Sequence, residues 1–170
     1  VGQIYTLEPE ERQRLITLAR QTIPASIPII SGVIGHRLKE VVQSAREARE
    51  AGADILEVMP PFDVRPFRRL MGMADVPYQF FKDLAREVDM PMAIFKYAGE
   101  TGSAYSTETL VRIAEDIDQV VAMKASCYTC ADYYQLWNSL KGKLSVFVTG
   151  VDTVDMLGQM MIGSDGAQAG

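Results

Sequence analysis

Residues 120–124 have the sequence Val-Val-Ala-Met-Lys, a short apolar run that ends in a lysine. The two β-branched residues at its start favour a buried strand, whereas lysine is among the residues least often buried in proteins. A helix that Ser106 is placed to cap precedes this run, and a second helix is expected near Ala131–Leu140. The run is therefore predicted to be a strand between two helices, with Lys124 at its C-terminal end.

The same alternation of strand and helix extends from this run toward both ends of the chain. Further strands are expected at Pro28–Val33, Ala53–Met59, Met92–Lys96 and Leu144–Val148, with a last one starting at Gly166. One helix is expected to end at about Gln21 and a second to end at Gly52. Two more are expected at Pro77–Val88 and Val154–Met161. Such an order predicts an α/β fold with a parallel sheet and right-handed crossovers. No Gly-x-Gly-x-x-Gly follows any of these strands, which argues against a dinucleotide-binding open sheet.

Composition excludes several classes of protein. With 48% hydrophobic and 23% charged residues, residues 1–170 are expected to form one globular domain. The net charge of −5 comes from interspersed acids and bases, so nucleic acid is not an expected partner. The sequence contains no apolar run long enough to span a membrane, and its first residues do not resemble a signal peptide. A cytoplasmic location is therefore expected, with no membrane partner.

Cysteine and histidine are too few for a disulfide framework or a tetrahedral zinc site, since the chain has only Cys127, Cys130 and His36. Neither a metal nor a cofactor is expected. Cys127 and Cys130 have the spacing of a redox pair, but nothing around them is typical of thioredoxin. Inert thiols at the start of a helix are the favoured interpretation, and His36 is expected to be a loop residue that only forms hydrogen bonds.

In parallel barrels the reacting groups project from the C-terminal ends of the strands, which is where Lys124 is predicted to lie. A lysine attacks a carbonyl only as the neutral amine, and burial among apolar groups disfavours its charged form. The sequence pattern alone leaves alternatives open, because Lys124 could instead extend to solvent or pair with Asp152. Lys96 also ends a predicted strand, but it points to the face opposite Phe95 and is expected to have a structural role.

Five segments resemble the family of dihydrodipicolinate synthase and N-acetylneuraminate lyase. They are Gly2-Gln3-x-x-x-Leu7-x-x-Glu10-Glu11, Pro28-Ile29-Ile30-x-Gly32-Val33, Ala51-Gly52-Ala53-Asp54 leading to Pro60-Pro61-Phe62, Val121-Ala122-Met123-Lys124, and Gly150-Val151-Asp152. The resemblance implies a (β/α)₈ TIM barrel that is incomplete here. By this alignment Val1 falls just inside the end of the second barrel strand and Gly170 falls in the eighth, so the chain is expected to be a fragment.

The family resemblance also implies a function and a site. Lys124 matches the lysine that forms a Schiff base with pyruvate or another 2-oxo acid, which implies a class I lyase acting on a 2-oxo acid or a sugar acid. Ser126, Gly150 and Asp152 match positions near the substrate. Backbone amides near Gly2 are expected to hold its carboxylate, and Gln168 is a further expected contact. A homotetramer is implied for the full-length protein.

The sequence departs from the family pattern at several functional positions. Val1 replaces a hydroxyl residue that helps to bind the substrate carboxylate, and Asp63 replaces an aromatic residue that is often donated across a subunit interface. Glu100 falls where the synthase has an arginine, so dihydrodipicolinate synthesis is not the expected reaction. These losses leave open an alternative function, a non-catalytic barrel that keeps the lysine and binds a metabolite.

The proton-relay tyrosine of the family falls on Phe95, which cannot exchange protons. Tyr97 lies two residues further along the predicted strand and shares a face with Phe95 if the strand continues that far. Tyr97 is therefore a candidate for the missing hydroxyl, and Phe95 is expected to line the substrate site.

Overall fold

The computed structural model describes residues 4, 6–59, 73–98, 105–150 and 155–168. Its six strands form one sheet in the order β1-β2-β3-β4-β5-β6, and every neighbouring pair is parallel. The strands are β1 (Ile30–Val33), β2 (Ile55–Val58), β3 (Met92–Lys96), β4 (Val120–Ala125), β5 (Val146–Gly150) and β6 (Gly166–Gln168). Sequential order and parallel pairing together require a crossover between each strand and the next.

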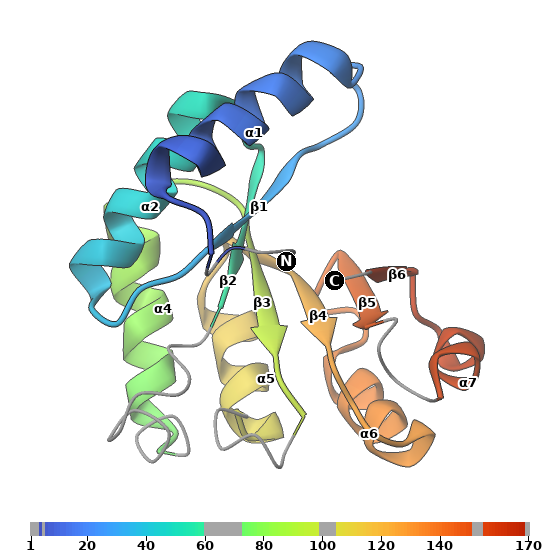
Figure 1. Ribbon diagram of the computed structural model, residues 1–170. Coiled ribbons are helices and arrows are strands. Elements are labelled where there is room, and N and C mark those ends of the chain that lie inside the picture. Colours follow the sequence, from blue (N-terminus) through green and yellow to red (C-terminus); the bar gives the residue numbers. More distant parts are fainter. Residues whose placement is uncertain (1–3, 5, 60–72, 99–104, 151–154, 169–170) are drawn as a thin grey trace.

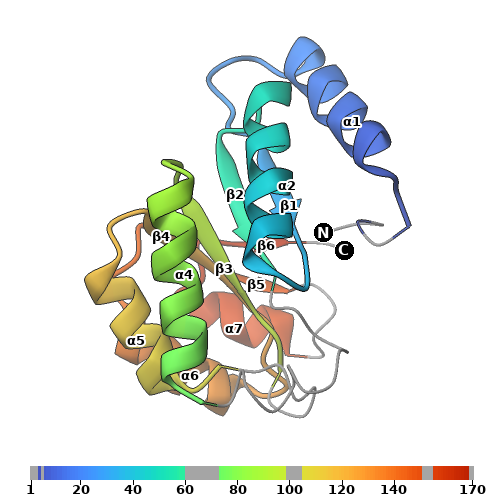
Figure 2. The same ribbon diagram turned by 90° about the vertical axis from the view of Figure 1, so that its left-hand side faces the viewer.

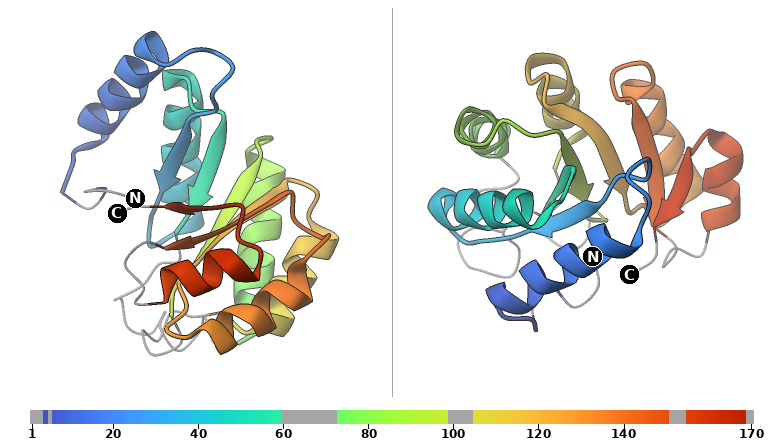
Figure 3. Two further views of the ribbon diagram at one scale, coloured as in Figure 1. Left: turned by 90° about the vertical axis from the view of Figure 1, so that its right-hand side faces the viewer. Right: turned by 90° about the horizontal axis from the view of Figure 1, so that it is seen from above.

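The helices between the strands supply these crossovers and cover the outside of the sheet, and one further helix precedes the first strand. They are α1 (Pro9–Thr22), α2 (Leu38–Ala51), α4 (Asp75–Glu87), α5 (Thr107–Asp116), α6 (Cys130–Leu140) and α7 (Met156–Ile162). Viewed along the sheet, the strands curl and the helices from α2 to α7 follow one another around the outside of that curl (Figure 3). The α1 helix packs beside α2 (Figures 1 and 2). The architecture is a curled α/β half-barrel.

Local signals in the sequence explain where several helices begin and end. The Ser106 hydroxyl accepts a hydrogen bond from the Thr109 backbone N–H at 3.1 Å, which confirms its predicted role as the cap of α5. Thr129 caps α6 in the same way through the Asp132 N–H. The α2 helix ends at Gly52, whose φ of 105° lies in the left-handed region that favours glycine.

The sheet has two faces with different packing. Its outer face and the helices share the main hydrophobic core, in which Leu56, Val58 and Met123 are fully or almost fully buried. A smaller cluster, which contains Met59 and Phe95, lies apart from that core. Because side chains alternate along a strand, residues next to those of the main core point to the inner, concave side.

The predicted strand positions agree with the structure to within a few residues. The Met92–Lys96 strand has the predicted bounds, and the strand that carries Lys124 continues by one residue to Ala125. The predicted strand at Leu144–Val148 is instead at Val146–Gly150, because Leu144 lies in a short isolated bridge with Lys141. This shift places Gly150 inside β5 rather than in the loop after it.

Candidate active site

Lys124 lies near the C-terminal end of β4 on the inner face of the sheet. Its neighbours Met123 and Ala125 belong to the outer core, so the lysine projects to the concave side. Only 4% of Lys124 is exposed, so the side chain does not extend into solvent as one sequence-based alternative proposed. Among the described residues it forms no ion pair. Asp152, the partner in the other alternative, lies outside those residues.

The face of an aromatic ring lies next to the buried amino group of Lys124. Nζ of Lys124 lies 4.3 Å from the centroid of the Phe95 ring, and the two residues are direct partners in the β3–β4 pairing. An aromatic face attracts a cation more weakly than a carboxylate does. Among the described residues, the lysine therefore lacks the charged partner that a buried lysine usually has.

Tyr97 lies on the same side of the sheet as Phe95, although β3 itself ends at Lys96. The two rings are 4.3 Å apart between centroids, at an angle of 48°, and both pack with the inner cluster of Ile4 and Met59. Phe95 in turn contacts Lys124. The strand thus does not continue to Tyr97, which was the condition for the prediction, but the Tyr97 ring still packs against Phe95 on the inner side.

Three further predicted residues, Ser126, Gly150 and Gln168, lie at the same end of the sheet as Lys124. Ser126 is buried directly after β4, and its backbone N–H donates to the Lys96 carbonyl at 2.9 Å. Gly150 is buried at the end of β5 and pairs with Gln168 in β6. Because carboxyl ends of parallel strands meet at one edge, these residues and Lys124 share that edge. Gly2 and Asp152, the remaining predicted site residues, lie outside the described residues.

One residue of the inner face, Glu57 in β2, is absent from the site predicted from the sequence. Its side chain is 2% exposed, and one carboxylate oxygen accepts a hydrogen bond of 2.7 Å from the Gln168 side-chain amide. The other oxygen, Oε1, has no partner among the described residues. The sequence did contain a signal for this residue, because Glu57 is a lone acid inside the apolar strand Ile55–Val58. A carboxylate is rarely fully buried, so its position in such a strand is unusual.

The outer face carries the second lysine and the cysteine pair. Nζ of Lys96 lies 3.8 Å from Sγ of Cys127, which packs in the main core. Burial raises the pKa of the Cys127 thiol, and the Lys96 charge only partly opposes that rise. The pKa of Cys130 is also raised, first by burial and then by Asp155. Both cysteines are free thiols whose reactive thiolate form is disfavoured, in line with the inert interpretation.

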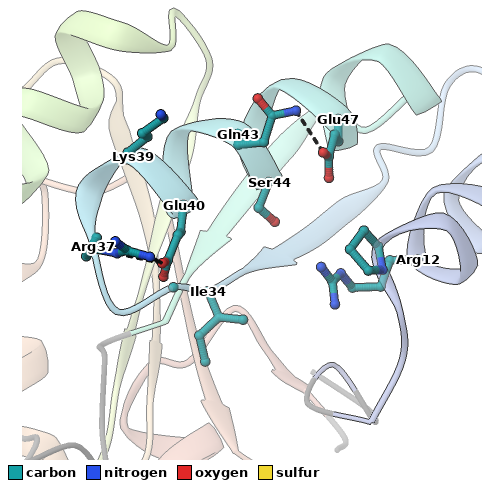
Figure 4. A pocket seen from close by; sticks show the side chains of 10 residues that line it. Arg12, Ile34, Arg37, Lys39, Glu40, Gln43, Ser44 and Glu47 are labelled. Carbon is teal, nitrogen blue, oxygen red and sulfur yellow. Dashed lines mark hydrogen bonds and ion pairs between the residues drawn. The ribbon is translucent and has the colours of Figure 1, made fainter.

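A cavity of about 480 Å³ lies outside the sheet, between α1 and α2 (Figure 4). Two polar pairs lie along its wall: Arg37 pairs with Glu40, and the Gln43 amide donates to Glu47 at 2.8 Å. His36 is exposed beside it, and its backbone N–H donates to Glu40. Of the predicted site residues that the structure describes, none lines this cavity, so the inner face remains the candidate active site.

Among the described residues, no cluster of three or more histidine, cysteine or acidic side chains could hold a metal ion. None of the helices in that part of the chain is both long and apolar enough to cross a membrane.

Fold and site together define a parallel α/β half-barrel with a buried lysine at the end of a strand. The model of the dihydrodipicolinate synthetase family matches residues 1–169. The chain belongs to this family, which confirms the resemblance noted in the sequence.

Individual relatives agree with that assignment. The 4-hydroxy-tetrahydrodipicolinate synthase of Bacillus subtilis (strain 168) is 31% identical over 123 residues, which are 72% of this chain and 40% of the relative. The enzyme of the same name from Chlorobium phaeovibrioides is 29% identical over 97% of this chain and 53% of its own length. The chain therefore spans about half the length of curated relatives that it matches.

A solved structure gives the same result. The chloride-inhibited dihydrodipicolinate synthase of Acinetobacter baumannii, solved in complex with pyruvate, superposes with a TM-score of 0.84 at 27% identity. The superposition covers 98% of this chain and 54% of that enzyme. The half-barrel thus corresponds to part of the barrel of a family member that binds pyruvate.

Proposed function

We propose that the protein is a lyase that acts on a 2-oxo acid, such as pyruvate or a sugar acid, through a Schiff base with Lys124. The observation that carries this proposal is a lysine that is 4% exposed, on the concave side of a parallel barrel sheet, against an aromatic ring. The neutral amine of a lysine is the nucleophile that attacks the carbonyl of a 2-oxo acid. The pyruvate complex of the Acinetobacter baumannii enzyme supports the choice of substrate class.

In the proposed reaction, Nζ of Lys124 attacks the carbonyl carbon of the 2-oxo acid. Loss of water gives an iminium ion, which withdraws electrons from the bond that is to be broken or formed. Tyr97 is the proposed proton donor and acceptor, because it lies beside Phe95 and Phe95 contacts the lysine. Ser126 and Asp152 are proposed to orient substrate hydroxyls, and amides near Gly2 to hold the carboxylate.

The walls of the site and the assembly belong to the same proposal. We infer that Gly150, Gln168 and Phe95 line the substrate site, since all three lie on or at the end of strands that border the inner face. The six strands are proposed to be the third to the eighth of an eight-stranded barrel, with Val1 at the end of the second. The full-length protein is proposed to be a cytoplasmic homotetramer.

Borohydride trapping tests the chemistry. Full-length protein incubated with pyruvate and borohydride is expected to gain one covalent adduct per chain, because borohydride reduces an imine to a stable amine. The Lys124→Arg variant keeps the charge but stays protonated, so it is expected to gain no adduct. Lys96→Arg is the matched control and is expected to be trapped like the wild type.

Failure of trapping would change the proposed function. If neither pyruvate nor a panel of longer 2-oxo sugar acids forms an adduct, the catalytic proposal is wrong. A non-catalytic barrel that binds a metabolite would then be the better description, and saturable binding of the same compounds by calorimetry would establish it.

A further inference from the structure

The inner face holds two buried charged side chains, and the proposed chemistry uses only one of them. Among the described residues, Lys124 and Glu57 are the only charged side chains that are buried. Glu57 lies in β2 between Leu56 and Val58, which both pack in the outer core. Because side chains alternate along a strand, Glu57 points to the concave side, as Lys124 does.

A hydrogen bond across the curl shows how far Glu57 reaches into the interior. Its carboxylate accepts from the Gln168 amide at 2.7 Å, although the two residues are 111 positions apart in the sequence. Gln168 comes from β6, at the opposite end of the sheet order from β2. The two side chains therefore meet inside the concave side of the half-barrel, which Figure 3 shows from above.

The β3 strand lies between the strands that carry Glu57 and Lys124, so its pairing gives their relative positions. Glu57 is the β2 partner of Ala93, and Lys124 is the β4 partner of Phe95, the next residue of β3 on the same face. In parallel barrels, the inward side chains of alternate strands form common layers, and β2, β4 and β6 are alternate strands. Glu57 and Lys124 thus face the same concave side, and Lys124 lies two residues further toward the carboxyl ends of the strands.

One oxygen of this carboxylate lacks a hydrogen bond. Oε1 of Glu57 has no partner among the described residues, and Glu57 makes no ion pair with Lys124. A buried carboxylate oxygen without a donor is costly, so native structures normally supply one. Glu57 and Gln168 both line a cavity of about 240 Å³, whose other described lining residues come from the segment before β1 and from β1 itself. This cavity leaves space beside the carboxylate for a hydrogen-bond donor from a ligand.

We propose that Oε1 of Glu57 accepts a hydrogen bond from a hydroxyl of the substrate, so that Glu57 selects hydroxylated 2-oxo acids over pyruvate. This inference rests on the proposed function, since it concerns the substrate of the same site. Gln168 holds the other oxygen and thereby fixes the orientation of the carboxylate. An acceptor that is already desolvated and oriented discriminates strongly between a ligand that carries the matching donor and one that lacks it.

The test compares two probes, pyruvate and 2-keto-3-deoxygluconate, which carries hydroxyls on its distal carbons. For each, the concentration that gives half-maximal borohydride trapping is measured with full-length protein. Glu57→Met keeps a side chain of similar length but removes the acceptor. It is expected to shift the ratio of the two concentrations against the hydroxylated acid by about ten- to a hundredfold, the range for a hydrogen bond to a charged group.

A matched control separates specificity from a general loss of packing. Gln159→Met removes a buried amide on the outer side, where Gln159 contacts Thr149 and the Cys127 carbonyl. This variant is expected to leave the ratio at its wild-type value. Should Glu57→Met fail to fold, Gln168→Met provides a second test, because it keeps Glu57 but releases its carboxylate, and a smaller shift in the same direction is expected.

The possible outcomes are distinct. A ratio that does not change in Glu57→Met or in Gln168→Met overturns the inference and leaves Glu57 with a structural role. Wild-type protein that traps pyruvate but not 2-keto-3-deoxygluconate overturns the inference while supporting the imine chemistry. Absence of trapping with either probe overturns the proposed function itself.

Discussion

The two faces of the sheet use the same residue types for different purposes. On the outer face, Lys96 lies half-buried beside the Cys127 thiol, within a core of apolar side chains from six helices and the strands. On the inner face, Lys124 is buried against Phe95 with no anion in contact among the described residues. Outer-face packing stabilises the fold. Inner-face groups are held in costly arrangements, as is common at functional sites.

This difference shows why the position of a lysine in a strand matters more than its presence. Lys96 and Lys124 both lie near the ends of neighbouring strands, and Lys96 is paired with Ala125 in the ladder. A single step along the strand reverses the face, so one lysine meets the core helices and the other meets the barrel interior. The predictions below test this separation of stability from chemistry, beginning with the largest expected effect.

Removing a large side chain from the outer core should destabilise the fold without altering the chemistry. Phe81 in α4 is fully buried and packs edge-to-face against Phe80 and Tyr105. Phe81→Ala is expected to lower the free energy of unfolding by about 3–5 kcal/mol, because it leaves a cavity. Urea unfolding of the full-length protein measures the loss. If the variant folds but no longer traps pyruvate, packing on the outer face and chemistry on the inner face are not independent.

On the inner face, loss of a hydroxyl should affect turnover more than stability. Tyr97→Phe is expected to lower kcat on a 2-oxo acid by about a hundredfold or more, the usual contribution of a general acid or base. Phe95→Tyr restores a hydroxyl at the family position and should not lower kcat. Steady-state kinetics with thermal melts of both variants measure these effects. If Tyr97→Phe keeps full activity, Tyr97 is not the proton donor.

The pH dependence of the outer-face thiol should follow from its burial. Because the folded pKa of Cys127 is raised above the ordinary value of 9.0, the folded state keeps its proton where the unfolded chain loses it. Its contribution to stability is therefore complete below pH 9.0 and is lost as the pH rises through the folded pKa.

Lys96→Met provides the corresponding test. It removes the positive charge that lowers the pKa of Cys127 against the effect of burial. The midpoint of Cys127 alkylation by iodoacetamide should therefore move to higher pH. A midpoint that moves to lower pH would contradict the contact between Lys96 and Cys127. Cys127→Ser identifies the contribution of Cys130 to the same reaction.

The smallest effect is expected at Tyr105, whose buried hydroxyl has no hydrogen-bond partner among the described residues. Burial strongly raises the pKa of this phenol. Tyr105→Phe keeps the ring contact with Phe81 and removes only the desolvated hydroxyl, so stability should stay the same or rise by up to about 1 kcal/mol. A loss of more than that in a urea melt would reveal a partner for the hydroxyl.

Local features of the fold could be predicted from the sequence because they depend on short-range physics. The cap at Ser106, the helix stop at Gly52 and the bounds of β3 all follow from neighbouring residues. The start of β5 was placed two residues too early, because Leu144 is apolar like a strand residue but lies in an isolated bridge instead.

The site could be predicted only in part, because some of its contacts depend on how the sheet curls. Burial of Lys124 follows from an apolar strand, and the Phe95–Tyr97 contact follows from alternation. Glu57 and Gln168 meet only because β6 curls toward β2, and no local pattern encodes a contact between residues 111 positions apart. A lone acid in a buried strand is the type of local conflict that indicates such a contact.

The most direct test of the account is the position of the trapped adduct. Full-length protein is reduced with borohydride in the presence of pyruvate, digested, and mapped by mass spectrometry. The account predicts that the modified lysine is Lys124, because only this lysine is buried on the inner face without an anionic contact among the described residues. An adduct on Lys96 would move the nucleophile to the outer face and contradict the account.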